Sequence, residues 1–410
     1  MAIKRVIVHL GMSKAGSSSI QHTLFNNASI LEKNGFRYLT EWGVNHLYIL
    51  HNLFSQCSPC PNKTRNRDKT HSFKMHKNMN KHNINTMLKV INTTECETLI
   101  LSGEYSSELS FTFTIENIKA FLKKYFHDNK IETTIIFIVR NPLTWAISSL
   151  QHKIYHSSLL TTNNVDFFEF AINIYYDGVM NLKNHFSESL ILLKFEEACL
   201  DDNGLTGGFL KALDFPGESL SEFNTSRQNE SRCMEAMEFK YYIEAAEPLF
   251  VNSFGRLNPN RRKKELASLR NIKGAKFDLS YQSKVELWKR FQSKILLLKE
   301  NTGIDYTDYK ITPTLHNQET YSEETVQGFI DIFPKLSIVL QKHFLKFFEK
   351  KYMETAQEKF KPLHFKDSIP WKAYKQKNTF LCLLNLRIKN TLIAMTPSKY
   401  KRSLMRIWEK

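Results

Sequence analysis

The feature that most constrains the fold is a strand-like apolar segment that runs directly into a helical pattern near the N-terminus. Residues 3–10 (IKRVIVHL) have the β-branched apolar character of a buried strand in a parallel sheet. From Ser17 onward apolar residues recur at every third or fourth position, which predicts a helix, and Gly35 is a suitable C-terminal cap. Residues 11–16 therefore form a tight turn between a strand end and a helix start.

Similar patterns recur along the chain. Residues 97–105, 132–139 and 189–197 predict three further strands, and residues 115–126 predict an amphipathic helix. Strands that alternate with helices predict an α/β fold, a P-loop-like doubly wound parallel sheet flanked by helices. Because right-handed crossovers place the carboxyl ends of such strands along one edge, we expect the functional residues at that edge.

The pattern becomes helical after about residue 222, so we expect additional C-terminal helices. We predict an α/β core over residues 1–225, with an insertion loop at 41–82 where the sequence is polar and weakly periodic. A helical part over residues 226–370 would pack on this core, and residues 371–410 form a basic amphipathic segment. The boundary near 225 is weakly marked, and the helices equally suit a layer on one face of the sheet.

The composition favours a reducing compartment. Six cysteines in 410 residues are too few for a disulfide framework. The N-terminal apolar run is too short for a signal peptide, and Arg387 and Lys389 interrupt the most lipid-like stretch, residues 379–395. We therefore expect a cytoplasmic protein without a transmembrane helix.

The net charge of +16 predicts an acidic partner. Nucleic acid, anionic lipid, acidic polysaccharide and phosphorylated small molecules all fit this charge. The positive charge gathers in residues 59–82 and in the last forty residues, where a merely solvated basic surface is an equal alternative. The segment 371–410 suits peripheral contact with the inner face of an anionic membrane, and equally a helix packed on the core.

A pair of cysteines raises the question of a metal. Cys57 and Cys60 have CxxC spacing, with His51 and His71 nearby, but a second pair of ligands at zinc-site spacing is missing. We interpret this stretch as an ordinary loop and expect no metal to be required.

The turn after the first strand has the chemistry of an anion site. The first N–H groups of a helix lack intrahelical partners and lie at the positive end of its dipole, so Gly16, Ser17, Ser18 and Ser19 can cradle an anion. Lys14 adds a full positive charge. In a Walker A loop the lysine follows the last glycine, whereas Lys14 precedes Gly16, so this is a different kind of phosphate loop.

A second anion site is predicted after the third expected strand. Arg140 follows the apolar run, Asn141 and Pro142 suit the start of a helix, and Thr144 and Ser148 lie on one face of that helix. Arg140 and Ser148 would grip one phosphate. Two anion sites on neighbouring strand ends suit a nucleotide with phosphates at both ends.

These two motifs, KAGSSS and RNPLTWAIS, resemble the sulfotransferase family that uses 3′-phosphoadenosine 5′-phosphosulfate (PAPS). The resemblance covers roughly the first 240 residues and is closest to bacterial members that act on glycans and other cell-surface acceptors. It implies that the 5′-phosphosulfate binds to Lys14, Ala15, Gly16, Ser17, Ser18 and Ser19, and that the 3′-phosphate binds to Arg140 and Ser148. An arginine-lysine-glycine element found in the small-molecule members is not evident, which leaves Arg227 as a candidate to complete the 3′-phosphate site.

The implied activity is transfer of a sulfuryl group from PAPS to a saccharide hydroxyl by in-line displacement, leaving adenosine 3′,5′-bisphosphate (PAP). Lys14 would neutralise charge on the departing phosphate. Glu104 would be the base, because it ends the preceding strand and family members place a glutamate or histidine comparably. Alternatively, Glu104 caps a turn or pairs with a basic side chain. The other candidate bases are His46, His51 and His152, whereas His9 is expected to be a hydrogen-bonded core residue.

Two other functions stay open. A nucleic-acid-binding protein is supported only by the charge and by the 12% aromatic content, since we find no zinc-finger repeat, RNA-recognition motif or helix-turn-helix. A nucleotide kinase is opposed by the position of Lys14. We therefore expect a glycan or glycolipid as the acceptor, either neutral or acidic. We expect no nucleic-acid partner.

Overall fold

The computed structural model describes residues 2–56, 73–105, 108–156, 164–225, 232–246, 268–313, 321–336 and 338–355. The chain divides into two compact units. Unit 1 comprises residues 1–231 and 278–314, and unit 2 comprises residues 232–277 and 315–410. The first division lies near the boundary expected at 225. Residues 278–314, which we expected in the helical part, belong to unit 1, because helix α12 (Tyr281–Thr302) packs against α6 (Pro142–His156) and α7 (Asn164–Phe186).

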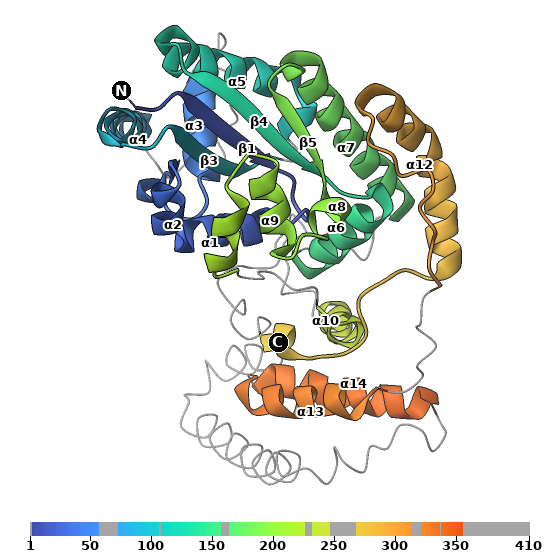
Figure 1. Cartoon of the computed structure of the whole chain (residues 1–410). Coiled ribbons are helices and arrows are strands. Elements are labelled where there is room, and N and C mark those ends of the chain that lie inside the picture. Colours follow the sequence, from blue (N-terminus) through green and yellow to red (C-terminus); the bar gives the residue numbers. More distant parts are fainter. Residues whose placement is uncertain are drawn as a thin grey trace, which may run out of the picture. The chain divides into compact units, whose positions relative to one another are not determined.

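Unit 1 contains a sheet of five parallel strands in the order β2, β3, β1, β4, β5 (Figure 1). The strands are β1 (Arg5–Gly11), β2 (Phe36–Tyr38), β3 (Thr98–Glu104), β4 (Glu132–Val139) and β5 (Leu190–Lys194). This confirms the expected doubly wound parallel sheet. The sequence did not indicate β2, whose three residues are too few to show a period. The fourth expected strand ends early, because helix α8 (Phe195–Ala198) follows β5 directly.

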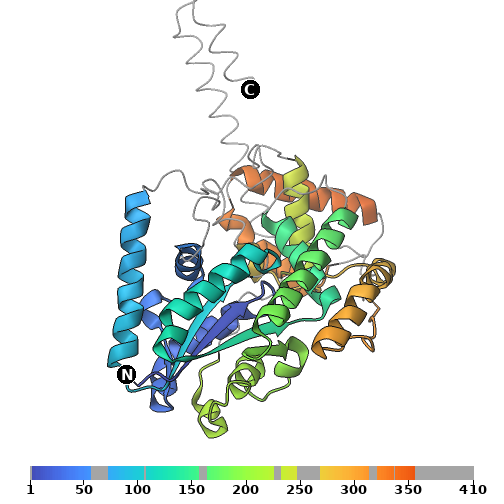
Figure 2. The same cartoon turned by 90° about the horizontal axis from the view of Figure 1, so that it is seen from above.

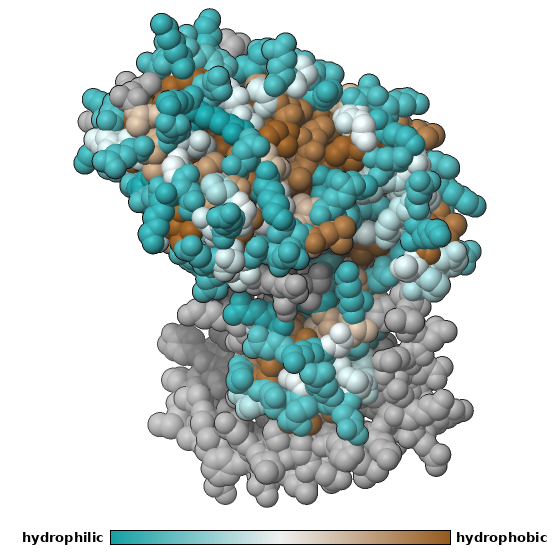
Figure 3. All heavy atoms as spheres, viewed as in Figure 1, coloured by the Kyte–Doolittle hydropathy of each residue, from teal (hydrophilic) through white to brown (hydrophobic). Residues whose placement is uncertain are grey.

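The centre of the core lies along β1, which pairs with β3 on one side and β4 on the other. Every residue of β1 from Val6 to Gly11 is buried, as expected for a strand covered on both faces. By contrast, β5 forms an edge of the sheet, and all five of its residues are only partly buried. Apolar side chains accordingly reach the surface in the region of β5 (Figure 3).

Helices cover both faces of the sheet (Figures 1 and 2). One face carries α1 (Ser17–Asn26), α2 (Ala28–Lys33) and α9 (Gly204–Lys211), and the other carries α3 (Leu47–Gln56), α5 (Thr112–Tyr125) and α7. The two crossovers that leave β1 and β3 run in opposite directions, since β2 and β4 lie on opposite sides of β1. Right-handed connections then put their helices on opposite faces, and the carboxyl end of β1 is the switch point at which ligands bind in doubly wound sheets.

The expected insertion loop at 41–82 is wrong in its described part. This part holds a short 3-10 helix (Thr40–Trp42), α3 and the beginning of α4 (Phe73–Thr93). Leu50, Leu53 and Phe54 are buried on one side of α3, and the Phe54 ring packs edge-on against Phe121 of α5 at 5.1 Å. The sequence of α3 carries this helical spacing, but it lies within a longer polar stretch. Cys57 and Cys60 lie outside the described residues.

Unit 2 is helical in its described residues. It contains α10 (Met234–Ala246), α13 (Glu323–Ile332), α14 (Ile338–Thr355) and two short 3-10 helices, Ser268–Asn271 and Phe333–Lys335. Phe239, Phe329 and Phe344 are fully buried at the centre of its core. Among the residues that the structure describes, no helix is both long and apolar enough to cross a bilayer. The segment 371–410, for which membrane contact was considered, lies outside these residues.

Candidate active site

The turn after β1 has an unusual backbone that orients the start of α1. Lys14 and Gly16 both have positive φ angles, 65° and 79°. Gly16 is the N-cap, and its carbonyl accepts the first helical hydrogen bonds, from the N–H groups of Ser19 at 2.9 Å and Ile20 at 3.2 Å. The N–H groups of the preceding residues Ser17 and Ser18 therefore lie before the helical hydrogen-bond ladder, at the positive end of the helix dipole. Free N–H groups at the positive end of a helix dipole have the chemistry of an anion site.

The side chains of this turn divide into two sets. Ser17 is buried and its hydroxyl donates to the carbonyl of Met12 at 3.0 Å, so it holds the turn together. The Ala15 side chain is also buried, and its N–H bonds to the same carbonyl at 3.3 Å. Lys14, Ser18 and Ser19 are half-buried. The buried residues Ala15 and Ser17 therefore stabilise the turn, and the half-buried residues are the ones accessible to a ligand.

Arg140 lies directly after β4 and contacts the turn after β1. Its Nη1 donates to the carbonyl oxygen of Lys14, and its Nε donates to Thr144 Oγ1 at 3.2 Å. The guanidinium lies over the Phe195 ring, 4.9 Å from its centroid. A second contact joins the same two segments, since Trp145 Nε1 donates to the carbonyl of Ser13 at 2.9 Å. The two expected anion loops are therefore side by side.

Arg140 keeps its charge in this position. Burial lowers the pKa of the Arg140 guanidinium, while the nearby Glu196 carboxylate acts to raise it. A guanidinium group is effectively always protonated in proteins, so Arg140 carries a positive charge. The other predicted residue of this site, Ser148, is half-buried one turn beyond Thr144 on α6. Arg227 lies outside the described residues.

Glu104 lies at the same edge of the sheet, on the other side of β1. It is the last residue of β3, is half-buried, and stands opposite Gly11 in the strand register. The N–H of Tyr105 bonds to the carbonyl of Gly11 at 2.8 Å, which keeps this end of β3 against β1. His51 is exposed on α3 and stacks on the ring of Tyr105, the residue after Glu104, with 6.3 Å between the ring centroids.

Two of the histidines considered are buried in the core. His9 Nδ1 bonds to Ser102 Oγ at 2.8 Å, as expected for a core histidine, and burial lowers its pKa to about 3. His46 Nδ1 accepts the N–H of Ser102 at 3.0 Å, and burial lowers its pKa to about 4. His46 stacks on Tyr38 and is fully buried, so it cannot reach an acceptor hydroxyl. His152 is exposed on α6.

Three side chains near Arg140 were not indicated by the sequence. Tyr175 on α7, Glu196 on α8 and Tyr306 after α12 each contact the backbone next to Arg140. Glu196 fell inside the fourth expected strand, residues 189–197, and no role was expected for it. No local signal marks Tyr175 or Tyr306, because their partners are 35 and 167 residues away in the chain.

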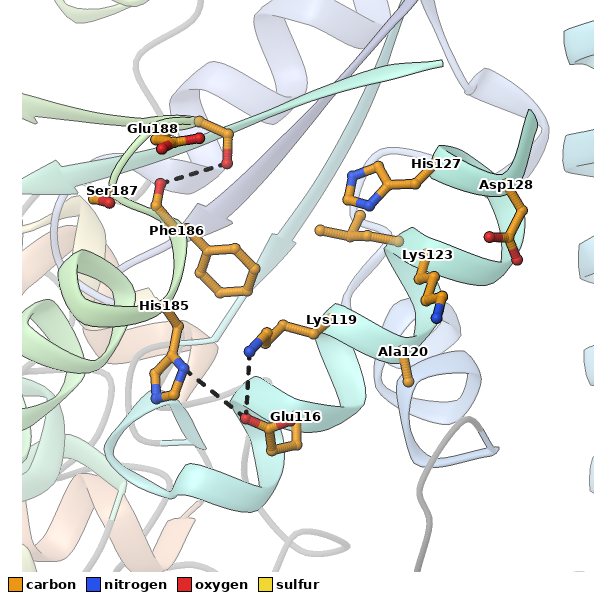
Figure 4. A pocket seen from close by; sticks show the side chains of 12 residues that line it. Glu116, Lys119, Ala120, Lys123, His127, Asp128, His185, Phe186, Ser187 and Glu188 are labelled. Carbon is orange, nitrogen blue, oxygen red and sulfur yellow. Dashed lines mark hydrogen bonds and ion pairs between the residues drawn. The ribbon is translucent and has the colours of Figure 1, made fainter. Parts of the chain in front are cut away.

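A pocket elsewhere in unit 1 does not belong to this site. It has a volume of about 770 Å³ and is lined by the last turns of α5 and α7 and by residues 127–128 and 187–189. These segments precede β4 and β5, so the pocket lies at the opposite edge of the sheet from Lys14 and Arg140. Within the pocket lining, the Glu116 carboxylate lies 3.7 Å from the Lys119 ammonium group and 3.9 Å from His185 Nδ1 (Figure 4).

Among the described residues, no group of three or more histidine, cysteine, aspartate and glutamate side chains is placed to hold a metal ion.

Comparisons with known proteins give structural likenesses only. No model of a protein family matches the sequence, and no curated protein is similar to it. A sulfotransferase from Alicyclobacillus acidocaldarius has 13% identity and a TM-score of 0.33, with 61% of this chain and 96% of that chain covered. A mouse sulfotransferase complexed with PAP has 12% identity and a TM-score of 0.31, covering 73% and 86%. A sulfotransferase from Mycobacterium avium has 14% identity and a TM-score of 0.32, covering 72% and 77%. At these values the likeness carries no argument about activity, which rests on the residues of the site.

Proposed function

We propose that this chain is a PAPS-dependent sulfotransferase that transfers a sulfuryl group to a saccharide hydroxyl by in-line displacement. One observation carries the proposal: the turn holding Lys14 and the loop holding Arg140 follow neighbouring parallel strands and are hydrogen-bonded to each other. Each supplies a cation at the carboxyl edge of the sheet, where nucleotides bind in doubly wound folds. A nucleotide with phosphate groups on both sides of its ribose matches two adjacent cationic sites.

The residues of the two loops have distinct roles in this proposal. The N–H groups of Ser17 and Ser18 and the Lys14 ammonium group bind the 5′-phosphosulfate, and Arg140 with Ser148 binds the 3′-phosphate. The donor chemistry fits, because N–H groups and cations are the usual ligands of phosphate oxygens. Lys14 contributes most to the rate, since charge builds on the departing phosphate only during transfer.

The order of the strands separates the two sides of the site. Glu104 ends β3, the Lys14 turn follows β1, and Arg140 follows β4. These three strands are consecutive in the sheet. The acceptor would therefore approach from the β3 side, where Glu104 takes the proton of its hydroxyl, while the 3′-phosphate is held on the β4 side. This order places the base away from Arg140, whose charge would otherwise stabilise the carboxylate and weaken it as a base.

The acceptor that we propose is a cell-surface or capsular glycan, or a glycolipid. The sequence resemblance to bacterial glycan-modifying members supports this class. The net charge of +16 further suits an acidic acceptor and a cytoplasmic protein that contacts an anionic membrane peripherally.

Calorimetry with PAP tests the proposal. The wild-type protein is expected to bind PAP with micromolar affinity, and Arg140→Ala and Lys14→Ala are each expected to weaken binding at least about tenfold, because each loses a charge-assisted contact. Arg290→Ala is the matched control, since this exposed arginine pairs with Glu286 and Glu169 on the surface of unit 1. Absence of PAP binding by the wild type, with a normal circular dichroism spectrum, would refute the proposed function.

A further inference from the structure

We propose that Tyr175, Glu196 and Tyr306 act as positioning residues that hold Arg140 in place for the 3′-phosphate. We call this set the Arg140 clamp. The inference rests on the proposed function, because it assigns a purpose to contacts around a nucleotide-binding arginine.

The clamp fixes the backbone of three consecutive residues. The Tyr306 hydroxyl lies 2.9 Å from the carbonyl oxygen of Val139, and the Tyr175 hydroxyl donates to the carbonyl of Arg140 at 2.6 Å. The N–H of the next residue, Asn141, donates to Glu196 Oε1 at 2.9 Å. Side chains from three separate elements thus hold the segment on which the Arg140 side chain is mounted.

Glu196 and Tyr306 also contact each other. Tyr306 Oη lies 2.8 Å from Glu196 Oε2, so one carboxylate links the tyrosine to the backbone N–H of Asn141. Burial and the adjacent carboxylate raise the pKa of Tyr306, which keeps its hydroxyl proton available for donation. Lys194 lies over the Tyr306 ring at 5.0 Å and pairs with Glu197 at 2.9 Å. A compact set of charges therefore surrounds the clamp.

The clamp matters because the Arg140 side chain is long. Its contacts with the carbonyl of Lys14 and with Thr144 Oγ1 need the Arg140 backbone at a fixed place. A shift of that backbone would move the guanidinium away from the turn after β1 and from any phosphate bridging the two loops. Preorganised groups bind more tightly, since less conformational freedom is lost when the ligand binds. A clamp variant should therefore weaken recognition of the 3′-phosphate specifically.

The test compares two nucleotides that differ only in the 3′-phosphate. Calorimetry, with competition where binding is weak, gives the affinities of full-length Tyr306→Phe and Glu196→Gln for PAP and for adenosine 5′-monophosphate. We expect each variant to bind PAP about tenfold more weakly, as for loss of a hydrogen bond that supports a charged group, and to bind the monophosphate within about twofold of wild type. Tyr176→Phe is the matched control, because Tyr176 follows Tyr175 on α7, is partly exposed, and keeps its ring contact with Lys294.

A double-mutant cycle separates positioning from general stability. If Tyr306 acts through Arg140, Tyr306→Phe should have no further effect on PAP affinity in an Arg140→Ala background. Equal weakening of both nucleotides, or a full tenfold effect in that background, would overturn the clamp while leaving the proposed function intact. Failure of the wild type to bind PAP would instead refute the proposed function and the clamp together. Should Tyr306→Phe fail to fold, Tyr175→Phe and Glu196→Gln supply the same comparison.

Discussion

At the scale of single residues, the account depends on which group removes the acceptor proton. Glu104 ends β3, and the ring of the next residue, Tyr105, stacks on His51 of α3. His46 is excluded by its burial, and burial also lowers its pKa to about 4. Glu104 has the better position, because it directly ends the strand beside the Lys14 turn, whereas His51 lies on α3. The assignment of Glu104 as the base remains a prediction.

We expect Glu104→Gln to keep its affinity for PAP within about twofold and to lose roughly 100-fold or more in turnover, since a positioned general base contributes about that much. Turnover is measured as transfer of labelled sulfate from PAPS to a glycan acceptor. His51→Asn is the matched variant and should stay within a few-fold of wild type. If Glu104→Gln keeps near wild-type turnover and His51→Asn loses most of it, His51 and not Glu104 is the general base.

At the scale of elements, the sequence predicted those helices, strands and turns that residues close together in the chain determine. The segment from β1 through the turn to α1 was predictable, because a β-branched run, a glycine and a helical period follow one another within thirty residues. The same holds for Arg140 after β4. Polar residues dilute the period of α4, whereas α3 is mostly apolar and was missed because the residues on either side of it are polar. Glu196 and Tyr306 could not be predicted, since their contacts with residues 139–141 join parts of the chain 55 and 167 residues apart.

Two glycines test the turn after β1. Gly16 and Gly35 both have φ of 79°, but a Cβ at Gly16 would lie 2.1 Å from Leu205 Cδ2, whereas at Gly35 it would meet nothing within 4 Å. Gly35→Ala should therefore lower the free energy of unfolding by only the left-handed backbone penalty, about 1–2 kcal/mol. Gly16→Ala should cost more and also weaken PAP binding about tenfold or more, because the first helical N–H groups shift.

Urea denaturation and calorimetry check both glycine variants. The account of the turn is contradicted if Gly16→Ala binds PAP as tightly as Gly35→Ala does.

At the scale of the whole molecule, the described site residues all belong to unit 1. The sequence placed a boundary near 225, close to where the first segment of unit 1 ends, because the strand pattern stops there. It did not show that residues 278–314 return to unit 1 and bring Tyr306 to the site, since α12 has the same helical period whichever core it packs on. The two cores also differ in composition: the core of unit 2 is rich in phenylalanine, whereas the strands of unit 1 bury mainly aliphatic side chains.

Truncation of a core residue in each unit tests this division. Phe329→Ala removes a fully buried ring that packs against Phe239 and Phe344, and should lower the stability of unit 2 by about 3–5 kcal/mol. PAP affinity should stay unchanged at a temperature where the variant is folded. Phe209→Ala, which removes the ring against His9 in unit 1, should instead reduce the fraction of protein able to bind PAP. Weaker PAP binding by folded Phe329→Ala would mean that unit 2 contributes to the nucleotide site.

A crystal structure of the complex with PAP measures the central claim most directly. The account predicts that the 5′-phosphate lies at the N–H groups of Ser17 and Ser18 beside Lys14, and that the 3′-phosphate lies within hydrogen-bond distance of the Arg140 guanidinium. A nucleotide that contacts only one of these two loops, or that binds away from the carboxyl ends of β1 and β4, would contradict it.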